Sequence, residues 1–307
     1  MNAAIRAVVR TGIYLGCKVY GVEKGYSGLI DNLFRPFDLA GVANIIQRGG
    51  TILKSNRCDE FHKKKFRKIA VENMRRQGVD GLVCIGGDGT FRGSEKLWQE
   101  FQFPVAGVPG TIDNDLGGTD ITIGFDTAIN TCVHAIDQIR DTASSHDRIF
   151  IVEVMGRNSG YIAMDVGIGG GADAIIVPEK KTSVAGIAEQ IQRGVNRGKT
   201  SSIIVVAEGK KSGNSMEIAR ELKAKYGFSA RVCILGHIQR GGSPSARDRK
   251  VASVMGAMAV RELMRGYTCF MTGVRGLEPV LVPISEAVEE RKQMHTDLFE
   301  LAHVLAT

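Results

Sequence analysis

The chain has 307 residues, of which 43% are hydrophobic and 24% charged, as in a globular protein large enough for two domains. The net charge of +7 is spread along the sequence and only 6% of residues are aromatic, which argues against nucleic-acid binding and favours small anionic ligands. The six cysteines lie far apart without a C-x-x-C pair, which argues against a zinc site or disulfide framework and predicts a reducing, cytoplasmic compartment. No apolar run approaches the roughly 20 residues of a membrane helix, so we expect no membrane partner.

Hydrophobic periodicity and glycine punctuation predict alternating helices and strands in the first third of the chain. Arg6 and Arg10 share one face of the first predicted helix, where two like charges are either a solvated face or an anion site. The predicted elements are a helix at 1–15, a strand at 18–22, a helix at 38–48, a polar loop at 51–57, a basic helix at 61–77 and a strand at 81–85.

A glycine cluster, Gly86-Gly87-Asp88-Gly89-Thr90, joins the strand at 81–85 to a predicted helix at 91–101. A strand, a glycine turn and a helix in this order aim backbone N–H groups and a helix N-terminus at phosphate oxygens. An aspartate inside such a cluster would repel phosphate unless a divalent cation joined them. Asp88 is therefore a candidate magnesium ligand.

The next apolar run, at 103–108, leads into Pro109-Gly110-Thr111-Ile112-Asp113-Asn114-Asp115. The Pro-Gly pair ends the strand, so the acidic side chains that follow project from its carboxyl end, where open parallel sheets bind ligands. Two aspartates this close are either turn formers that accept backbone N–H bonds or functional carboxylates. In the functional interpretation, Asp113 is the candidate general base and Asp115 a candidate ligand of a metal or its waters.

The rest of the chain continues the same alternation, with buried strands about 25 to 40 residues apart, as in βαβ units. This pattern predicts an α/β fold with two doubly wound, mainly parallel sheets of the Rossmann type, covered by helices on both faces. Predicted helices lie at 126–144, 159–167, 184–197, 215–226 and 245–265, and predicted strands at 148–154, 174–177, 202–207, 231–235 and 279–283, with a mainly helical end from 285.

Charged side chains gather at the ends of these strands and form two sets. Acidic groups are Asp88, Asp113 and Asp115, and groups that contact anions are Arg157, Arg231, His237 and Arg240. Phosphoryl transfer needs a divalent metal, donors for the charge on the moving group and a base beside the attacking hydroxyl. The two sets can supply all three.

Four motifs together resemble the bacterial-type ATP-dependent 6-phosphofructokinase family: Gly86 to Thr90, Pro109 to Asp115, Met155-Gly156-Arg157 and Gly236 to Pro244. The resemblance covers nearly the whole chain in order. It implies the phosphofructokinase fold, with a nucleotide-binding domain at 1–124 plus 239–289 and a sugar-phosphate-binding domain at 125–238 plus 290–307. It also implies transfer of a phosphoryl group from MgATP to the 1-hydroxyl of fructose 6-phosphate, giving fructose 1,6-bisphosphate and ADP in glycolysis.

The same resemblance implies roles for single residues. Asp113, Thr111 and Arg157 are the implied catalytic residues, with Asp113 as proton acceptor and Thr111 near the transferred group. Asp88 is implied at the magnesium, and Asp115 stays a candidate for the metal or its waters. Implied substrate contacts are Thr111, Asp113, Arg148, Met155, Gly156, Arg157, Glu208, Arg231, His237 and Arg240, and implied nucleotide contacts are Arg75, Arg76, Gly87, Asp88, Gly89, Thr90 and Gly110.

Two further implications concern the phosphoryl donor and the assembly. Gly89 and Gly110 favour ATP, because pyrophosphate-using relatives carry an Asp and a Lys there that fill the adenylate space. Arg148 and Arg231 match residues that reach into a neighbouring subunit's site, which implies a homotetramer.

A third implication is an effector site for an anion of the ADP or phosphoenolpyruvate type, which would make the two arginines of the first helix an anion site. Asp173 stands where relatives often have Glu, which leaves the effector's identity open. The implied effector residues are Arg6, Arg10, Arg57, Arg140, Asp173 and Lys199.

Family members carry a strand and a T-S-G-G-D loop before the segment that matches Met1 to Ala4, and this sequence has neither. We therefore expect a truncated sequence or a start codon assigned too late, and the acid-free N-terminus to be an internal helix rather than a targeting peptide. The alternatives are a binding or regulatory subunit without ATP turnover, a pyrophosphate-dependent relative, and a lipid or NAD kinase. The last shares G-G-D-G-T but lacks the Gly236 to Pro244 motif.

Overall fold

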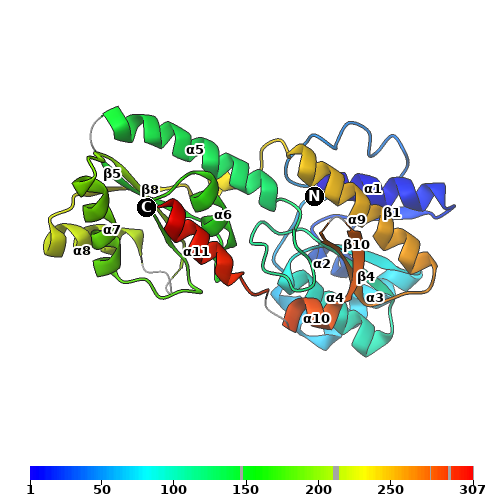
Figure 1. Ribbon diagram of the computed structural model, residues 1–307. Helices are drawn as coiled ribbons and strands as arrows, with labels where there is room; N and C mark the ends of the chain where they lie inside the picture. Colours follow the sequence, from blue (N-terminus) through cyan, green and yellow to red (C-terminus); the bar gives the residue numbers. More distant parts are fainter. Residues whose placement is uncertain (146–147, 210–213, 277, 290–291, 307) are drawn as a thin grey trace. The chain divides into compact units, whose positions relative to one another are not determined.

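The computed structural model describes residues 1–145, 148–209, 214–276, 278–289 and 292–306 (Figure 1). The chain divides into two compact units. Unit 1 contains Met1–Thr111, Leu116–Gly124 and Gly241–Lys292, and unit 2 contains Ile112–Asp115, Phe125–Arg240 and Gln293–Thr307. The four residues Ile112–Asp115 thus belong to unit 2, although the chain on both sides of them belongs to unit 1.

Unit 1 is built on a four-stranded sheet in the order β10-β9-β4-β3, in which β9, β4 and β3 are parallel and β10 is antiparallel. Its strands are β3 (Leu82–Gly86), β4 (Val105–Pro109), β9 (Phe270–Arg275) and β10 (Glu278–Pro283), and a separate antiparallel pair is formed by β1 (Val19–Val22) and β2 (Phe34–Phe37). Its helices are α1 (Asn2–Tyr14), α2 (Tyr26–Ile30), η1 (Asp59–His62), α3 (Lys64–Arg76), α4 (Asp88–Phe101), α9 (Ala246–Met264) and α10 (Ile284–Glu289).

Helices cover both faces of this sheet because β4 alternates its side chains between two apolar clusters. Ala106 and Val108 pack with residues of α1 and α9. Val105, which precedes Ala106 and so points to the opposite face, packs with residues of α3, α4 and α10. With both faces buried, the functional side chains are left to the strand ends.

Unit 2 is built on a four-stranded, fully parallel sheet in the order β6-β7-β5-β8. On one face, Ile151, Ile204 and Val206 pack with α7 and α8. Its strands are β5 (Ile149–Val154), β6 (Ala174–Ile176), β7 (Ser202–Ala207) and β8 (Ala230–Ile234), and its helices are α5 (Phe125–Ser145), α6 (Tyr161–Gly169), α7 (Val184–Asn196), α8 (Ser215–Tyr226), η2 (Gly236–Gln239) and α11 (Thr296–Leu305). The predicted α/β class with mainly parallel sheets is confirmed.

The predicted helix at 38–48 is wrong, because this segment forms turns instead. The carboxylate of Asp38 accepts a hydrogen bond from Gly41 N at 2.7 Å, and Asn44 has a φ of 51°. Both features are turn chemistry, and they compete with a helix. The apolar residues Val42 and Ile45 are nevertheless buried, against Phe37.

Other differences concern elements that were missed or begin elsewhere. The sequence did not predict α2, β2 or β9, and α4 begins at Asp88, three residues earlier than predicted. The C-terminal part is divided between α10 and α11. In the described part of the chain, no helix combines the length and the apolar character needed to cross a membrane.

Candidate active site

The glycine cluster of unit 1 forms a tight connection between β3 and α4, with Gly87 as the N-cap of the helix. A Cβ on Gly86 would collide with the side chain of Thr90, and a Cβ on Gly87 would lie 3.3 Å from Thr111 Cβ. The approach at Gly86 favours glycine strongly, and the short distance at Gly87 shows that the first turn of α4 lies beside the end of β4. The first N–H groups of a helix have no partner within it, so this turn can receive phosphate oxygens.

Tyr26 supports this turn from α2, and the sequence did not point to it. Its ring stacks on Phe61 with centroids 3.9 Å apart, and its hydroxyl donates to the carbonyl of Thr90. Burial raises the pKa of both Tyr26 and the neighbouring Cys84 thiol, the latter to about 12. Both groups therefore stay neutral at physiological pH and serve packing.

Asp88 begins α4 with a carboxylate that is 46% exposed and paired with Arg92. Arg92 Nε lies 2.9 and 3.0 Å from the two carboxylate oxygens, and its Nη2 donates to Val288 O at 2.7 Å. In the described ranges no group of three or more His, Cys, Asp or Glu is placed to hold a metal. Magnesium commonly takes one or two carboxylates and completes its shell with water and phosphate. Asp88 fits such a single-carboxylate site.

Arg75 and Arg76, the two implied nucleotide contacts of α3, lie away from the glycine cluster. They are in the last turn of α3. Arg75 donates a hydrogen bond of 3.2 Å to the carbonyl of Phe101, and Phe101 is the C-terminal residue of α4. Asp88 is at the other end of this 14-residue helix, about 20 Å away at 1.5 Å per residue. The structure therefore does not bring the two arginines together with Gly87 to Thr90.

Asp113 belongs to unit 2, and its side chain is almost fully enclosed, with the residue 4% exposed. Arg157 Nε lies 3.7 Å from Asp113 Oδ2, and Ser159 Oγ donates to the Asp113 carbonyl at 3.1 Å. Burial raises the pKa of Asp113, and the negative charge of Asp115 raises it further, whereas Arg157 and Arg240 oppose the shift. A carboxylate with a raised pKa is a stronger base.

The loop after β5 presents Arg157 in a specific backbone conformation. Gly156 has a φ of 146° and Arg157 a φ of 56°. The backbone N–H of Arg157 donates to Glu208 Oε1 at 3.1 Å, at the end of β7. Met155, Gly156, Arg157 and Glu208 are thus brought together with Asp113 at the carboxyl edge of this sheet.

Replacing Gly156 with alanine is expected to lower the free energy of unfolding by about 2 kcal/mol. The added Cβ would lie inside the contact distance of the Ser159 carbonyl oxygen, and the φ of 146° is strained for any side chain. Chemical denaturation followed by circular dichroism measures the change. Gly186→Ala in α7 is the control, because its Cβ would meet only Ser183 Oγ at 3.4 Å. Equal free energies of unfolding for Gly156→Ala and Gly186→Ala would show that alanine is not strained at position 156.

Gln239 links Gly236, at the start of the Gly236 to Pro244 motif, to the residue that follows β5, and the sequence did not single it out. It is 2% exposed. Its Oε1 accepts from Met155 N at 3.0 Å, and its Nε2 donates to Gly236 O at 3.0 Å. The neighbouring His237 and Arg240 are exposed, as side chains that meet a ligand must be.

Arg148 and Arg231 lie at the opposite end of the same sheet. Arg148 directly precedes β5, whereas Met155 follows it, and six strand residues separate these ends by about 20 Å. Arg231 pairs with Phe150 in the parallel register of β5 and β8. Within one chain, unit 2 therefore does not bring these two arginines to Asp113.

Three of the implied effector residues come together in unit 2. Lys199 forms an ion pair with Asp173, whose other oxygen accepts from Ile203 N at 2.8 Å. Arg140 donates to the carbonyls of Gly170 and Gly171. Arg6, Arg10 and Arg57 belong to unit 1, where Arg6 is half-buried and the other two are exposed.

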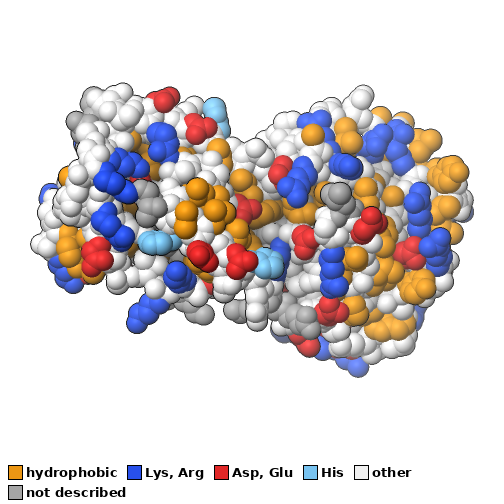
Figure 2. Space-filling model, in the orientation of Figure 1, with side chains coloured by type: hydrophobic (Ala, Val, Ile, Leu, Met, Phe, Trp, Pro, Cys, Tyr) orange, Lys and Arg blue, Asp and Glu red, His pale blue; other side chains and the backbone are white. Residues whose placement is uncertain are grey.

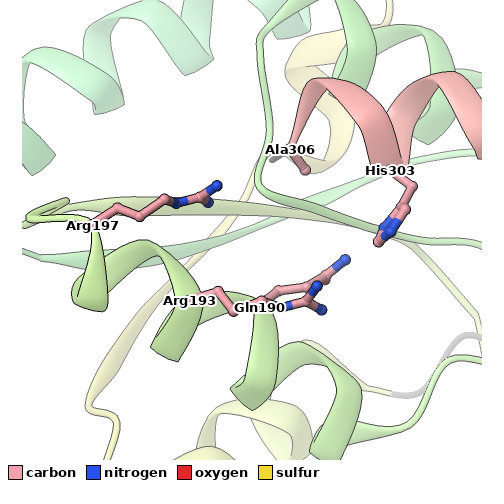
Figure 3. A pocket seen from close by; sticks show the side chains of 5 residues that line it. All are labelled: Gln190, Arg193, Arg197, His303 and Ala306. Atoms are coloured by element: carbon pink, nitrogen blue, oxygen red, sulfur yellow. The ribbon is translucent and has the colours of Figure 1, made fainter.

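On the face shown in Figure 2, Lys and Arg side chains are scattered among acidic ones rather than gathered in a stripe. A small concavity between α7 and α11 contains Gln190, Arg193, Arg197 and His303 (Figure 3). Its volume of about 10 Å³ is no more than one water molecule needs.

Comparisons of this chain with known proteins all find phosphofructokinases. The family model described as Phosphofructokinase matches residues 1–263. ATP-dependent 6-phosphofructokinase 1 of Thermus thermophilus is 52% identical over 306 residues, which are 100% of this chain and 95% of that protein. The solved phosphofructokinase of Saccharomyces cerevisiae has a TM-score of 0.88 at 33% identity and covers 94% of this chain and 43% of that one. A pyrophosphate-dependent phosphofructokinase of Marinobacter aquaeolei has a TM-score of 0.83 at 22% identity, covering 99% and 88%, and shares the fold.

Proposed function

Since the chain belongs to the phosphofructokinase family, we propose that it is a glycolytic kinase that phosphorylates the 1-hydroxyl of fructose 6-phosphate with ATP as donor. The observation that supports this most is the enclosed carboxylate of Asp113, beside Arg157 and at the edge of the unit 2 sheet. In the reaction, the O1–P bond forms, the P–O bond to ADP breaks, and the hydroxyl proton goes to Asp113. Purified protein with ATP, magnesium and fructose 6-phosphate should release ADP, and no release above the sugar-free control would reject the proposal.

Unit 2 supplies the sugar-phosphate contacts in this proposal. Arg157 would neutralise charge on the moving phosphoryl group, since its side chain is 65% exposed and its Nε lies close to Asp113. Met155, Gly156 and Glu208 would shape the sugar site, and His237 and Arg240 would bind the phosphate.

Unit 1 supplies the donor contacts. The turn Gly87 to Thr90 would receive the ATP phosphates, and Thr111 beside it would contact the transferred group. Asp88 would hold magnesium, which when bound neutralises charge on the phosphates. Asp115 is kept as a second candidate for contact with the metal or its waters. Arg75 and Arg76 stay predicted nucleotide contacts, and since Arg75 lies at the C-terminal end of α4, they would not contact the phosphates at Gly87 to Thr90.

The proposal extends to assembly and regulation. Arg148 and Arg231, which lie far from Asp113 in their own unit, would act in the site of a neighbouring copy within a homotetramer. An anionic effector would bind the predicted effector residues, of which unit 1 contains the two arginines of α1 and Arg57, and unit 2 contains Arg140, Asp173 and Lys199. The six free cysteines suit a reducing cytoplasm.

The pH dependence follows from Asp113 as the base. The carboxyl must be ionised to accept a proton, so kcat/KM for fructose 6-phosphate should fall as the pH drops through its pKa, above the ordinary value of 3.8. Asp115→Asn removes a like charge and should move this acid limb to lower pH, whereas Arg157→Gln removes an opposite charge and should move it to higher pH. Profiles of the three proteins measure the limb, and shifts of the reverse sign would exclude Asp113 as the titrating base.

A further inference from the structure

Alternate carbonyl groups along the turn that carries Asp113 are each held by a hydrogen bond. The carbonyl of Pro109 accepts from Ile123 N at 2.8 Å. The carbonyl of Thr111 accepts from the hydroxyl of Thr122 at 2.6 Å, and that of Asp113 accepts from the hydroxyl of Ser159 at 3.1 Å. Two of the three donors are side chains, so their bonds can be removed by substitution.

Both hydroxyls are buried, and flanking hydrogen bonds anchor the segment that bears Thr122. Thr122 is 0% exposed and Ser159 6% exposed. Hydrogen bonds fix the segment that bears Thr122 on both sides. Asp120 N donates to Val274 O at 2.8 Å, and Gly124 N donates to the buried carboxylate of Asp248 at 2.8 Å. Thr122 therefore presents its hydroxyl from a fixed support within unit 1.

The position of the Asp113 carboxylate depends on these bonds because one of them holds the carbonyl of Asp113 itself and another that of Thr111, two residues before it. The chain leaves unit 1 after Thr111 and returns at Leu116. Asn114, within this segment, has a φ of 51°, a left-handed backbone conformation that is uncommon for residues other than glycine. A catalytic group displaced by about 1 Å can lose on the order of a hundredfold in rate.

We propose that Thr122 and Ser159 are positioning residues for phosphoryl transfer, which hold the backbone on either side of Ile112 and so place the Asp113 carboxylate against the hydroxyl it deprotonates. The inference rests on the proposed function. Neither residue touches the reacting atoms in this scheme. Their loss should therefore reduce kcat and leave the KM values for both substrates nearly unchanged.

The test compares four substitutions that each remove one buried hydroxyl donating to a backbone carbonyl. Thr122→Val and Ser159→Ala should each lower kcat at least tenfold. Their matched controls are Thr272→Val, whose hydroxyl donates to Gly107 O at 3.2 Å, and Ser94→Ala, whose hydroxyl donates to Phe91 O at 2.9 Å; both residues are 0% exposed. The controls should keep kcat within about threefold, although they lose the same kind of bond.

Rescue separates positioning from a general loss of structure. Thr122→Ser keeps the donor and loses only a methyl group, so it should keep kcat within about threefold of the original even if Thr122→Val folds poorly. Equal kcat values for Thr122→Val and the Thr272 control, or equal losses for Thr122→Ser and Thr122→Val, would overturn the inference. If the unsubstituted chain shows no fructose 6-phosphate-dependent ADP release, the proposed function fails first and the inference falls with it.

Discussion

Replacing Asp113 with asparagine is expected to lower kcat by about a hundred- to ten-thousand-fold, which is the usual contribution of a positioned general base. Asparagine keeps the shape of the side chain but cannot accept the hydroxyl proton. The residue is 4% exposed, so bulk water has little access to act as base in its place. Steady-state ADP release at saturating ATP and fructose 6-phosphate measures the effect.

Asp113→Asn should also fold at least as well as the original chain. Burial is the main cause of the raised pKa of Asp113. The folded state therefore binds the proton more tightly than the unfolded state does, so stability falls as the pH rises through this interval and the ionised carboxylate opposes folding at neutral pH. Asn removes that cost. Thermal unfolding at neutral pH checks this, and Asp141→Asn, an exposed aspartate of α5, is the control for activity. A kcat within threefold of the original would exclude Asp113 as the base.

Replacing Gly89 with aspartate is expected to lower kcat/KM for ATP by about a hundredfold. A carboxylate placed about 4 Å from a phosphate charge is repelled by roughly 4 kcal/mol at an effective dielectric constant near 20, and solvent screening reduces this value. A Cβ at Gly89 meets nothing within 4 Å, so the side chain itself fits the protein. An acidic residue in the first turn of α4 is also compatible with the helix dipole.

Gly89→Ala is the matched control for this change. The alanine methyl group occupies the same open space without a charge. Because alanine replaces glycine inside a helix, the free energy of unfolding of this variant should rise by about 0.5 to 1 kcal/mol, and the variant should keep most of its activity with ATP. Assays over a range of ATP concentrations distinguish the two variants. If Gly89→Asp and Gly89→Ala use ATP equally well, then the turn after β3 does not receive the phosphates.

Local signals were sufficient where one segment settles its own structure. β7 was predicted at its exact bounds because Ser202–Ala207 is a short apolar run rich in β-branched residues. α8 was also exact, since Asn214 caps its N-terminus by accepting from Met216 N, and Gly227 ends it with a φ of 76°. The failed helix at 38–48 has suitable apolar spacing, but Asp38 and Asn44 favour turns and the packing against Phe37 does not need a helix.

The sequence alone determined the alternating α/β architecture, the glycine turn at Asp88 and the placing of Asp113 just past a strand end. These features depend on periodicity and on residues next to one another in the chain. The tertiary structure decided which groups surround them: Thr122 and Ser159 at the carbonyls around Asp113, Gln239 behind Met155, and Arg75 away from the glycine turn. Such partners are 11 to 84 residues apart in sequence, from Thr111 and Thr122 to Met155 and Gln239. Hydrogen bonds over these separations depend on the path of the chain and on the packing around each sheet. Local sequence patterns do not contain this information.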